Sequence, residues 1–307
     1  MVVIHALLLI AQISAVAASR PPECGVDGNL KGTNIWERAR HPELRHYCDV
    51  LATGSSKLVS LATAADALRA GQEADQIMPG HAAPLALEGR ALVKLGRFTE
   101  AYTAFTEAKK RDARSLDDPS ALLAFARACQ RSNHAGEALA AFRSLLPRAD
   151  GLAAGERAPA YVEAAFVAMS ASPGNVDDAI AMLRQARREA TDALQPISTL
   201  ALALALDRSG ARDEARAVLD DRAKAAARNV ARDTNVTSLL GPLAYEGEAM
   251  AALGLETVDA PAAHDAWQRY VEAAGASGVW VDHAKARVQA TPSRPGGAVR
   301  AAGARAR

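Results

Sequence analysis

Four side chains of types that bind metals lie near the N-terminus of this 307-residue chain: Cys24, His41, His46 and Cys48. Cysteine thiolates and histidine imidazoles are common ligands of zinc. However, His46 and Cys48 are two residues apart on an expected helix, so their side chains point about 200° apart around its axis. A disulfide between Cys24 and Cys48 is the simpler prediction, and a zinc-binding module at these four residues is the alternative.

The segment DGNLKGTNIWE begins like a calcium loop, with Asp27 at position 1 and Gly32 at position 6. Lys31 then takes position 5, where an oxygen ligand belongs, and Arg38 takes position 12, where a bidentate glutamate belongs. A lysine in the cage would repel the ion. We therefore predict turns followed by a helix start with Asn34 as its N-cap, and no metal site.

Residues for catalysis are scarce. The sequence contains no serine nucleophile elbow, phosphate-binding glycine loop, HExxH pair or CxxC motif. We expect His81 and His134 in turns, His264 and His283 on helices, and all four at the surface. Cys129 lies at an apolar helix position and is expected to be a small buried hydrophobe. The sequence therefore predicts a protein that is not an enzyme and has no cofactor.

The elements that position these residues are expected to be helices. Half of the residues are apolar but only 4% are aromatic, and the apolar residues are mostly alanine and leucine. Such a chain builds its core by close helix packing. The net charge of +1 favours no partner class, and we predict no nucleic-acid partner.

The ends of the chain differ from its middle. Residues 1–19 lack charged side chains and end near a small-x-small cleavage pattern, which predicts a signal peptide, with an N-terminal anchor as the alternative. Membrane contact is expected only if this segment is uncleaved. Residues 20–47 are expected to hold a short helix. Residues 291–307 are basic, without acids or aromatics, and are predicted to be disordered.

A repeated pattern runs through the middle. Within residues 82–109, two apolar-periodic helices flank a turn at Gly96. Gly89 lies where the first helix meets the second closely, Ala101 is the small residue at their crossing, and Phe105 follows on the same face. Equivalent alanines recur at spacings of 34, 37, 41, 36 and 48 residues: Ala67, Ala101, Ala138, Ala179, Ala215 and Ala263.

These features resemble the tetratricopeptide repeat, a pair of antiparallel helices of about 34 residues. The resemblance implies an all-α, right-handed solenoid of five or six hairpins over residues 48–290, with short loop insertions at the longer spacings. Trp267 and Tyr270 are expected on a packing face. Val279, Trp280, Ala284 and Val288 are expected on a final capping helix. An alanine-rich bundle without repeats is the alternative.

In this family the first helices of the repeats line a concave groove. The matching positions hold four cations and then four apolar residues: Arg90, Lys94, Arg127, Arg131, Val162, Phe166, Leu200 and Leu204. The cations resemble the clamp with which some members hold a peptide's terminal carboxylate, although the clamp's asparagines are absent here. Convergent arginines favour carboxylate or phosphate groups.

The resemblance implies an exported bacterial scaffold or adaptor, periplasmic or secreted, that binds proteins or peptides, including acidic ones, in this groove. Two other classes remain open: the metal-binding module at Cys24, His41, His46 and Cys48, and a structural element that associates with itself.

Overall fold

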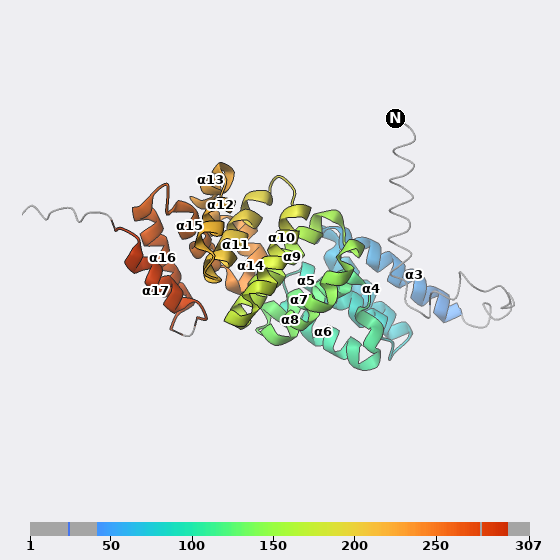
Figure 1. Ribbon diagram of the computed structural model, residues 1–307. Helices are drawn as coiled ribbons and strands as arrows, with labels where there is room; N and C mark the ends of the chain where they lie inside the picture. Colours follow the sequence, from blue (N-terminus) through green and yellow to red (C-terminus); the bar gives the residue numbers. More distant parts are fainter. Residues whose placement is uncertain (1–23, 25–41, 277, 294–307) are drawn as a thin grey trace, which may run out of the picture. The chain divides into compact units, whose positions relative to one another are not determined.

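The computed structural model describes Cys24, residues 42–276 and residues 278–293. These residues form fifteen α-helices joined by turns and 3₁₀ helices, with no strand among them (Figure 1). The described chain is therefore all-α, as the sequence predicts. The predicted signal segment, the DGNLKGTNIWE segment, His41 and the tail from residue 294 onward lie outside the described residues. The chain divides into two compact units, Met1–Val167 and Ala168–Arg307.

The first unit is a series of helices that pack on their neighbours in the sequence. Its helices are α3 (Pro42–Ser56), α4 (Leu61–Ile77), α5 (Ala82–Lys94), α6 (Phe98–Arg111), α7 (Pro119–Arg131), α8 (Ala135–Leu145) and most of α9 (Ala154–Ala171). Each helix from α3 to α7 contacts the next one, and α5 also contacts α3 and α7. The first helices of successive hairpins therefore lie side by side.

The turns between paired helices repeat one design. After α5, Gly96 has a φ of +74°, and the amide of Arg97 donates to the carbonyl of Leu92 at 2.9 Å. Asn133 after α7 (φ +66°) and Gly210 after α11 (φ +90°) occupy the same place. Each is followed by an amide that donates to a carbonyl five residues earlier. This left-handed closure satisfies the last carbonyls of a helix and reverses the chain at once.

The predicted crossing alanines are all buried, each with at most 1% of its surface exposed: Ala67, Ala101, Ala138, Ala179, Ala215 and Ala263. In the α5–α6 hairpin, a Cβ at Gly89 would lie 2.8 Å from the ring of Phe105, which is itself fully buried. Both helices can therefore approach closely only because Gly89 has no side chain. The predicted hairpin contacts are confirmed at these residues.

A disulfide joins Cys24 to Cys48 of α3, with an S–S distance of 2.02 Å and a Cα–Cα distance of 5.7 Å. This pairing confirms the sequence prediction, and it uses the two sulfur atoms that the zinc module would need as thiolates. Disulfides persist in oxidising compartments, so the bond is consistent with export. No helix among the described residues has the length and apolarity needed to cross a membrane.

The second unit is organised around α11. Its helices are α10 (Val176–Glu189), α11 (Gln195–Arg208), α12 (Arg212–Val218), α13 (Asp221–Ala227), α14 (Thr234–Leu240), α15 (Glu246–Leu255), α16 (Ala260–Ala274) and α17 (Val281–Ala290). Helix α11 contacts α10, α12, α13 and α15, and α16 contacts both α15 and α17.

The long spacing between Ala215 and Ala263 is not a loop. Helix α12 ends at Val218, and the chain then forms α13, a 3₁₀ helix at Val230–Arg232, and α14. Asp220 caps α13 by accepting a hydrogen bond from the amide of Ala223 at 2.8 Å. Asp233 caps α14 through the amide of Asn235, also at 2.8 Å. The expected loop insertion is therefore a helical insertion.

The predicted capping helix is α17, but Val279 and Trp280 both precede it and Val288 is only half-buried. Trp280 is buried and its indole N–H donates to the carbonyl of Met169 at 2.9 Å, while Ala284 is fully buried. Val279, by contrast, precedes α17 and is 40% exposed. Its place on the capping stripe was wrong because α17 begins only at Val281. Trp267 and Tyr270 are buried on α16 as predicted.

Candidate functional site

The predicted cationic row of the first unit comprises Arg90, Lys94, Arg127 and Arg131. Two of these arginines are committed to carboxylates of the same unit. Arg90 lies 3.6 Å from Asp118, the N-cap residue of α7. Arg127 makes a forked contact with Glu163, from Nε to Oε2 at 3.0 Å and from Nη2 to Oε1 at 2.8 Å.

The Arg127–Glu163 pair is a buried ion pair between α7 and α9. The Glu163 side chain is 2% exposed, and that of Arg127 is 22% exposed. Burial opposes the charge of Arg127, but the attraction and hydrogen bonds of Glu163, helped by Glu156, raise the pKa of Arg127 above its ordinary value. A ligand carboxylate would have to displace Glu163, which would remain buried without its partner.

The other two cations of the row have different surroundings. The Arg131 guanidinium lies 5.0 Å from the centre of the Phe98 ring, and burial lowers the pKa of Arg131. Lys94 is exposed at the end of α5. The row therefore does not present four available charges.

The four apolar residues of the predicted groove lie in the cores of the two units. Val162 and Phe166 in the first unit are at most 1% exposed, and Leu200 and Leu204 in the second are fully buried. Helix α11 is buried all round because its run of alternating alanine and leucine has no polar face. These side chains therefore offer no exposed surface to a peptide.

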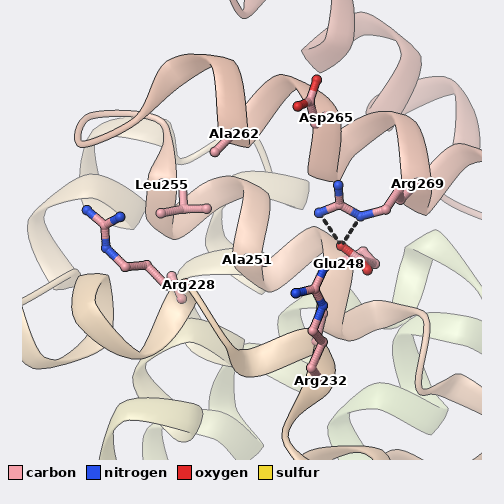
Figure 2. A pocket seen from close by; sticks show the side chains of 10 residues that line it. Arg228, Arg232, Glu248, Ala251, Leu255, Ala262, Asp265 and Arg269 are labelled. Carbon is pink, nitrogen blue, oxygen red and sulfur yellow. Dashed lines mark hydrogen bonds and ion pairs between the residues drawn. The ribbon is translucent and has the colours of Figure 1, made fainter.

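A second arginine cluster, which we call the arginine pocket, lies in the second unit (Figure 2). It is a cavity of about 140 Å³. Its apolar lining residues are Ala227, Ala231, Ala251, Leu255 and Ala262. Its charged lining residues are Arg228, Arg232, Glu248, Asp265 and Arg269. In Figure 2, Leu255 and Ala251 lie between Arg228 on one side and Arg232 and Arg269 on the other.

The helical insertion supplies two of these arginines. Arg228 directly follows α13, and Arg232 ends the next 3₁₀ helix. This 3₁₀ helix packs on α15, where a Cβ at Gly247 would come within 3.0 Å of the Cα of Ala231. Gly247 therefore allows the insertion to lie close to α15, which forms the floor of the pocket, while α16 contributes Asp265 and Arg269.

The charges of the arginine pocket are only partly paired. Arg269 donates to Glu248 at 3.0 Å. Within the described parts of the chain, Arg228 and Arg232 have no ion-pair partner, and neither does Asp265. Arg228 and Arg232 are both exposed. Three arginines and two carboxylates give this pocket a formal charge of +1, with two guanidinium groups available to an anion.

Sequence reasoning missed this pocket because it treated the insertion as a loop. The signals were nonetheless present: an interval of 48 residues between crossing alanines, aspartates at 220 and 233 that cap helices, and arginines four residues apart in ARNVAR.

A buried ionic network holds α11 to α15, α16 and α17. Arg208 donates to Glu246 at 2.6 Å and to the Tyr270 hydroxyl at 3.1 Å. His283 lies 2.7 Å from Asp207, and Arg287 lies 3.5 Å from it. His283 was expected at the surface, but its side chain is only 21% exposed and its ring contacts a carboxylate that is 1% exposed.

The pKa of Asp207 follows from this network. Burial raises the pKa of this carboxyl, but the hydrogen bond from His283 and the charge of Arg287 outweigh burial and lower it. Asp207 is thus a structural carboxylate, and each cation of the set contacts a carboxylate.

The free thiol of Cys129 is inaccessible. Cys129 is fully buried, as predicted, and burial raises the pKa of its thiol to about 12, so it is protonated at neutral pH. Among residues 42–276 and 278–293 with Cys24, no three His, Cys, Asp or Glu side chains come together in a group that could hold a metal ion.

The chain was also compared with known proteins. No protein-family model matches it, and no curated protein matches its sequence.

Proposed function

We propose that this chain is a non-catalytic binding protein that captures an acidic segment of a protein partner in the arginine pocket. The observation that carries the proposal is the pair Arg228 and Arg232, which lie at the edge of a cavity and have no carboxylate partner among the described residues. A guanidinium group binds a carboxylate through two parallel hydrogen bonds, which gives both energy and geometry. Arginines elsewhere, such as Arg127 and Arg208, already donate hydrogen bonds to Glu163 and Glu246.

The size of the pocket supports a side chain as the ligand. Pockets for small molecules usually measure about 300–1,000 Å³, whereas this one measures about 140 Å³. Ala251, Leu255 and Ala262 provide an apolar floor that suits the methylene groups of a glutamate, with its carboxylate at one of the two arginines. The rest of the affinity would come from the partner's surface around the pocket.

We also propose that the hairpins belong to a right-handed solenoid of the tetratricopeptide type and that residues 1–19 direct export. The repeated turns at Gly96, Asn133 and Gly210 support the first proposal, together with the buried crossing alanines. The Cys24–Cys48 disulfide supports the second. The protein would then act as a scaffold or adaptor in the cell envelope or outside the cell.

The test is a binding measurement with two peptide libraries, seven residues long, that have either Glu or Gln fixed at the centre. We expect the wild type to retain the Glu library selectively. The double variant Arg228→Gln with Arg232→Gln should retain it about tenfold less, since a charge-assisted hydrogen bond contributes about 1.5 kcal/mol or more.

The matched control is Arg188→Gln with Arg216→Gln. It removes the same charge from exposed positions of the same unit, where Arg188 contacts Gln185 and Arg216 contacts Asp213. The control should bind like the wild type. Equal retention of both libraries by the wild type, or an unchanged Glu preference in the pocket variant, would refute the proposed function.

A further inference from the structure

We propose that Glu248 and Asp265 make the arginine pocket selective for the singly charged carboxylate of a Glu or Asp side chain over the doubly charged phosphate of a phosphorylated one. This inference rests on the proposed function and names the class of acid that the site accepts. Arginine clusters bind both groups, so selectivity must come from the remaining residues of the pocket.

Glu248 reduces the charge that an incoming anion meets. Its carboxylate lies 3.0 Å from both Nε and Nη2 of Arg269, and its side chain is only 20% exposed. Two N–H groups of Arg269 are therefore already engaged, and the charge of Arg269 is offset by Glu248. Glu248 lies on α15, whose contact with the insertion fixes it beside Arg232 in the lining of the pocket.

Asp265 adds a second negative charge from α16. It has no ion-pair partner among the residues that the structure describes, and it lines the same cavity, so its uncancelled charge acts on any anion bound there. A single carboxylate on the ligand balances the formal charge of +1 of the arginine pocket. A phosphoserine carries a charge of about −1.5 to −2 at neutral pH and three acceptor oxygens, so its second charge would be opposed by Glu248 and Asp265.

The size of this effect is large enough to measure. Two unit charges about 4 Å apart interact by about 1 kcal/mol in water, which is about a fivefold change in affinity. Removing one carboxylate from the pocket should therefore improve phosphate binding about fivefold more than it improves carboxylate binding. The difference should shrink in high salt, because the site is open to solvent.

The experiment uses two small probes on the full chain: N-acetyl-glutamate α-amide, which carries one carboxylate, and N-acetyl-phosphoserine α-amide. Each is titrated at about pH 7.5 and low salt while the Nε–Hε nuclear magnetic resonance signals of Arg228 and Arg232 are followed. We expect the wild type to bind the carboxylate at least as tightly as the phosphate.

In Glu248→Gln and in Asp265→Asn, the ratio of phosphate to carboxylate affinity should rise about fivefold. The control Glu272→Gln, on α16 but outside the lining of the pocket, should leave the ratio unchanged. Circular dichroism checks that each variant is folded.

Two outcomes would overturn this inference alone: a several-fold preference of the wild type for phosphoserine, or an unchanged ratio in both pocket variants. If neither probe shifts the signals of Arg228 and Arg232, the inference and the proposed function both fail.

Discussion

The cationic row of the first unit and the arginine pocket of the second unit contain the same side chains in different electrostatic settings. Arg127 lies against Glu163, which is almost fully buried, and Arg90 faces Asp118. Arg228 and Arg232 are exposed beside a cavity, and no carboxylate in the described part of the chain pairs with them. A cluster of arginines in the sequence therefore indicates a binding site only when the surrounding carboxylates leave some of its charge available.

The buried arginines share a structural role. Arg127 on α7 pairs with Glu163 on α9, 36 residues later, and Arg208 on α11 pairs with Glu246 on α15, 38 residues later. Both spacings are close to one hairpin, so each pair ties the first helix of one hairpin to that of a later one. The pocket arginines lie instead in the helical insertion. The comparison predicts that the first group governs stability and the second governs binding.

The largest expected effect is from Arg127→Met, which removes the forked hydrogen bonds to Glu163 and leaves that carboxylate buried. Breaking a buried ion pair from one side costs about 3–5 kcal/mol, because the remaining charge is not compensated. The free energy of unfolding, measured with urea, should fall by about 3 kcal/mol. The double variant Arg127→Met with Glu163→Leu should recover most of the loss. If Arg127→Met unfolds like the wild type, the row is not structural and the comparison fails.

Asp207→Asn tests the buried network of the second unit. Hydrogen bonds to charged groups contribute about 1.5–3 kcal/mol, so we expect a loss of about 2 kcal/mol at pH 7. Because the pKa of Asp207 is lowered in the folded protein, its contribution is present above the unfolded pKa of about 4 and is lost as pH falls through the folded value. Urea unfolding of both proteins at pH 7 and pH 3 checks this, and an equal difference at both pH values would contradict it.

Glu88 in the first unit should give stability the opposite dependence on pH. Burial, with the nearby charge of Asp75, raises the pKa of Glu88 from 4.5 to about 7. Folding therefore favours its protonated form, and the cost of its charge appears as pH rises from 4.5 to about 7 and is complete above that.

Glu88→Gln should consequently stabilise the protein by about 1 kcal/mol at pH 8 and change little at pH 4.5. The stabilisation is smaller than the pKa shift alone implies, because the Glu88 side chain is partly exposed to solvent. A pH series of unfolding midpoints measures it. This variant sharpens the comparison between the two units. Glu88 is a half-buried carboxylate whose charge is not fully compensated in the first unit, whereas the pocket of the second unit has more arginines than carboxylates.

The smallest expected effect on stability is from Arg228→Gln with Arg232→Gln. Substitutions of surface residues without partners usually change stability by less than about 0.5 kcal/mol. The urea midpoint should therefore match that of the wild type even though acid binding falls about tenfold. A large destabilisation would show that these arginines support the insertion and would remove the distinction between the two regions.

The sequence predicted the parts of this fold that depend on local signals. Gly96 marks a helix end, Gly89 and Ala101 mark a close crossing, and Cys24 and Cys48 are paired as expected. Each of these features depends on a local requirement: a close helix crossing requires a small side chain, a helix end requires a positive φ, and a disulfide requires a second cysteine. The burial of Cys129 followed from its apolar position in the same way.

The pairing of charges could not be predicted in the same way. Glu163 lies 36 residues from Arg127, and only the packing of α7 on α9 brings the two together. The insertion was missed because α13 and α14 have seven residues each, which is shorter than the window in which helical periodicity is visible. Leu200 and Leu204 were placed in a groove because a helix with no polar face gives no sign of which side is exposed.

The most direct test of the comparison observes the arginines of both regions in one sample. N-acetyl-glutamate α-amide is added to protein labelled with ¹⁵N-arginine, and the Nε–Hε signals are assigned with single Arg→Lys variants. We predict that the signals of Arg228 and Arg232 shift with one common affinity while that of Arg127 does not move. A shift of Arg127 or Arg90 without any change at Arg228 and Arg232 would contradict the account.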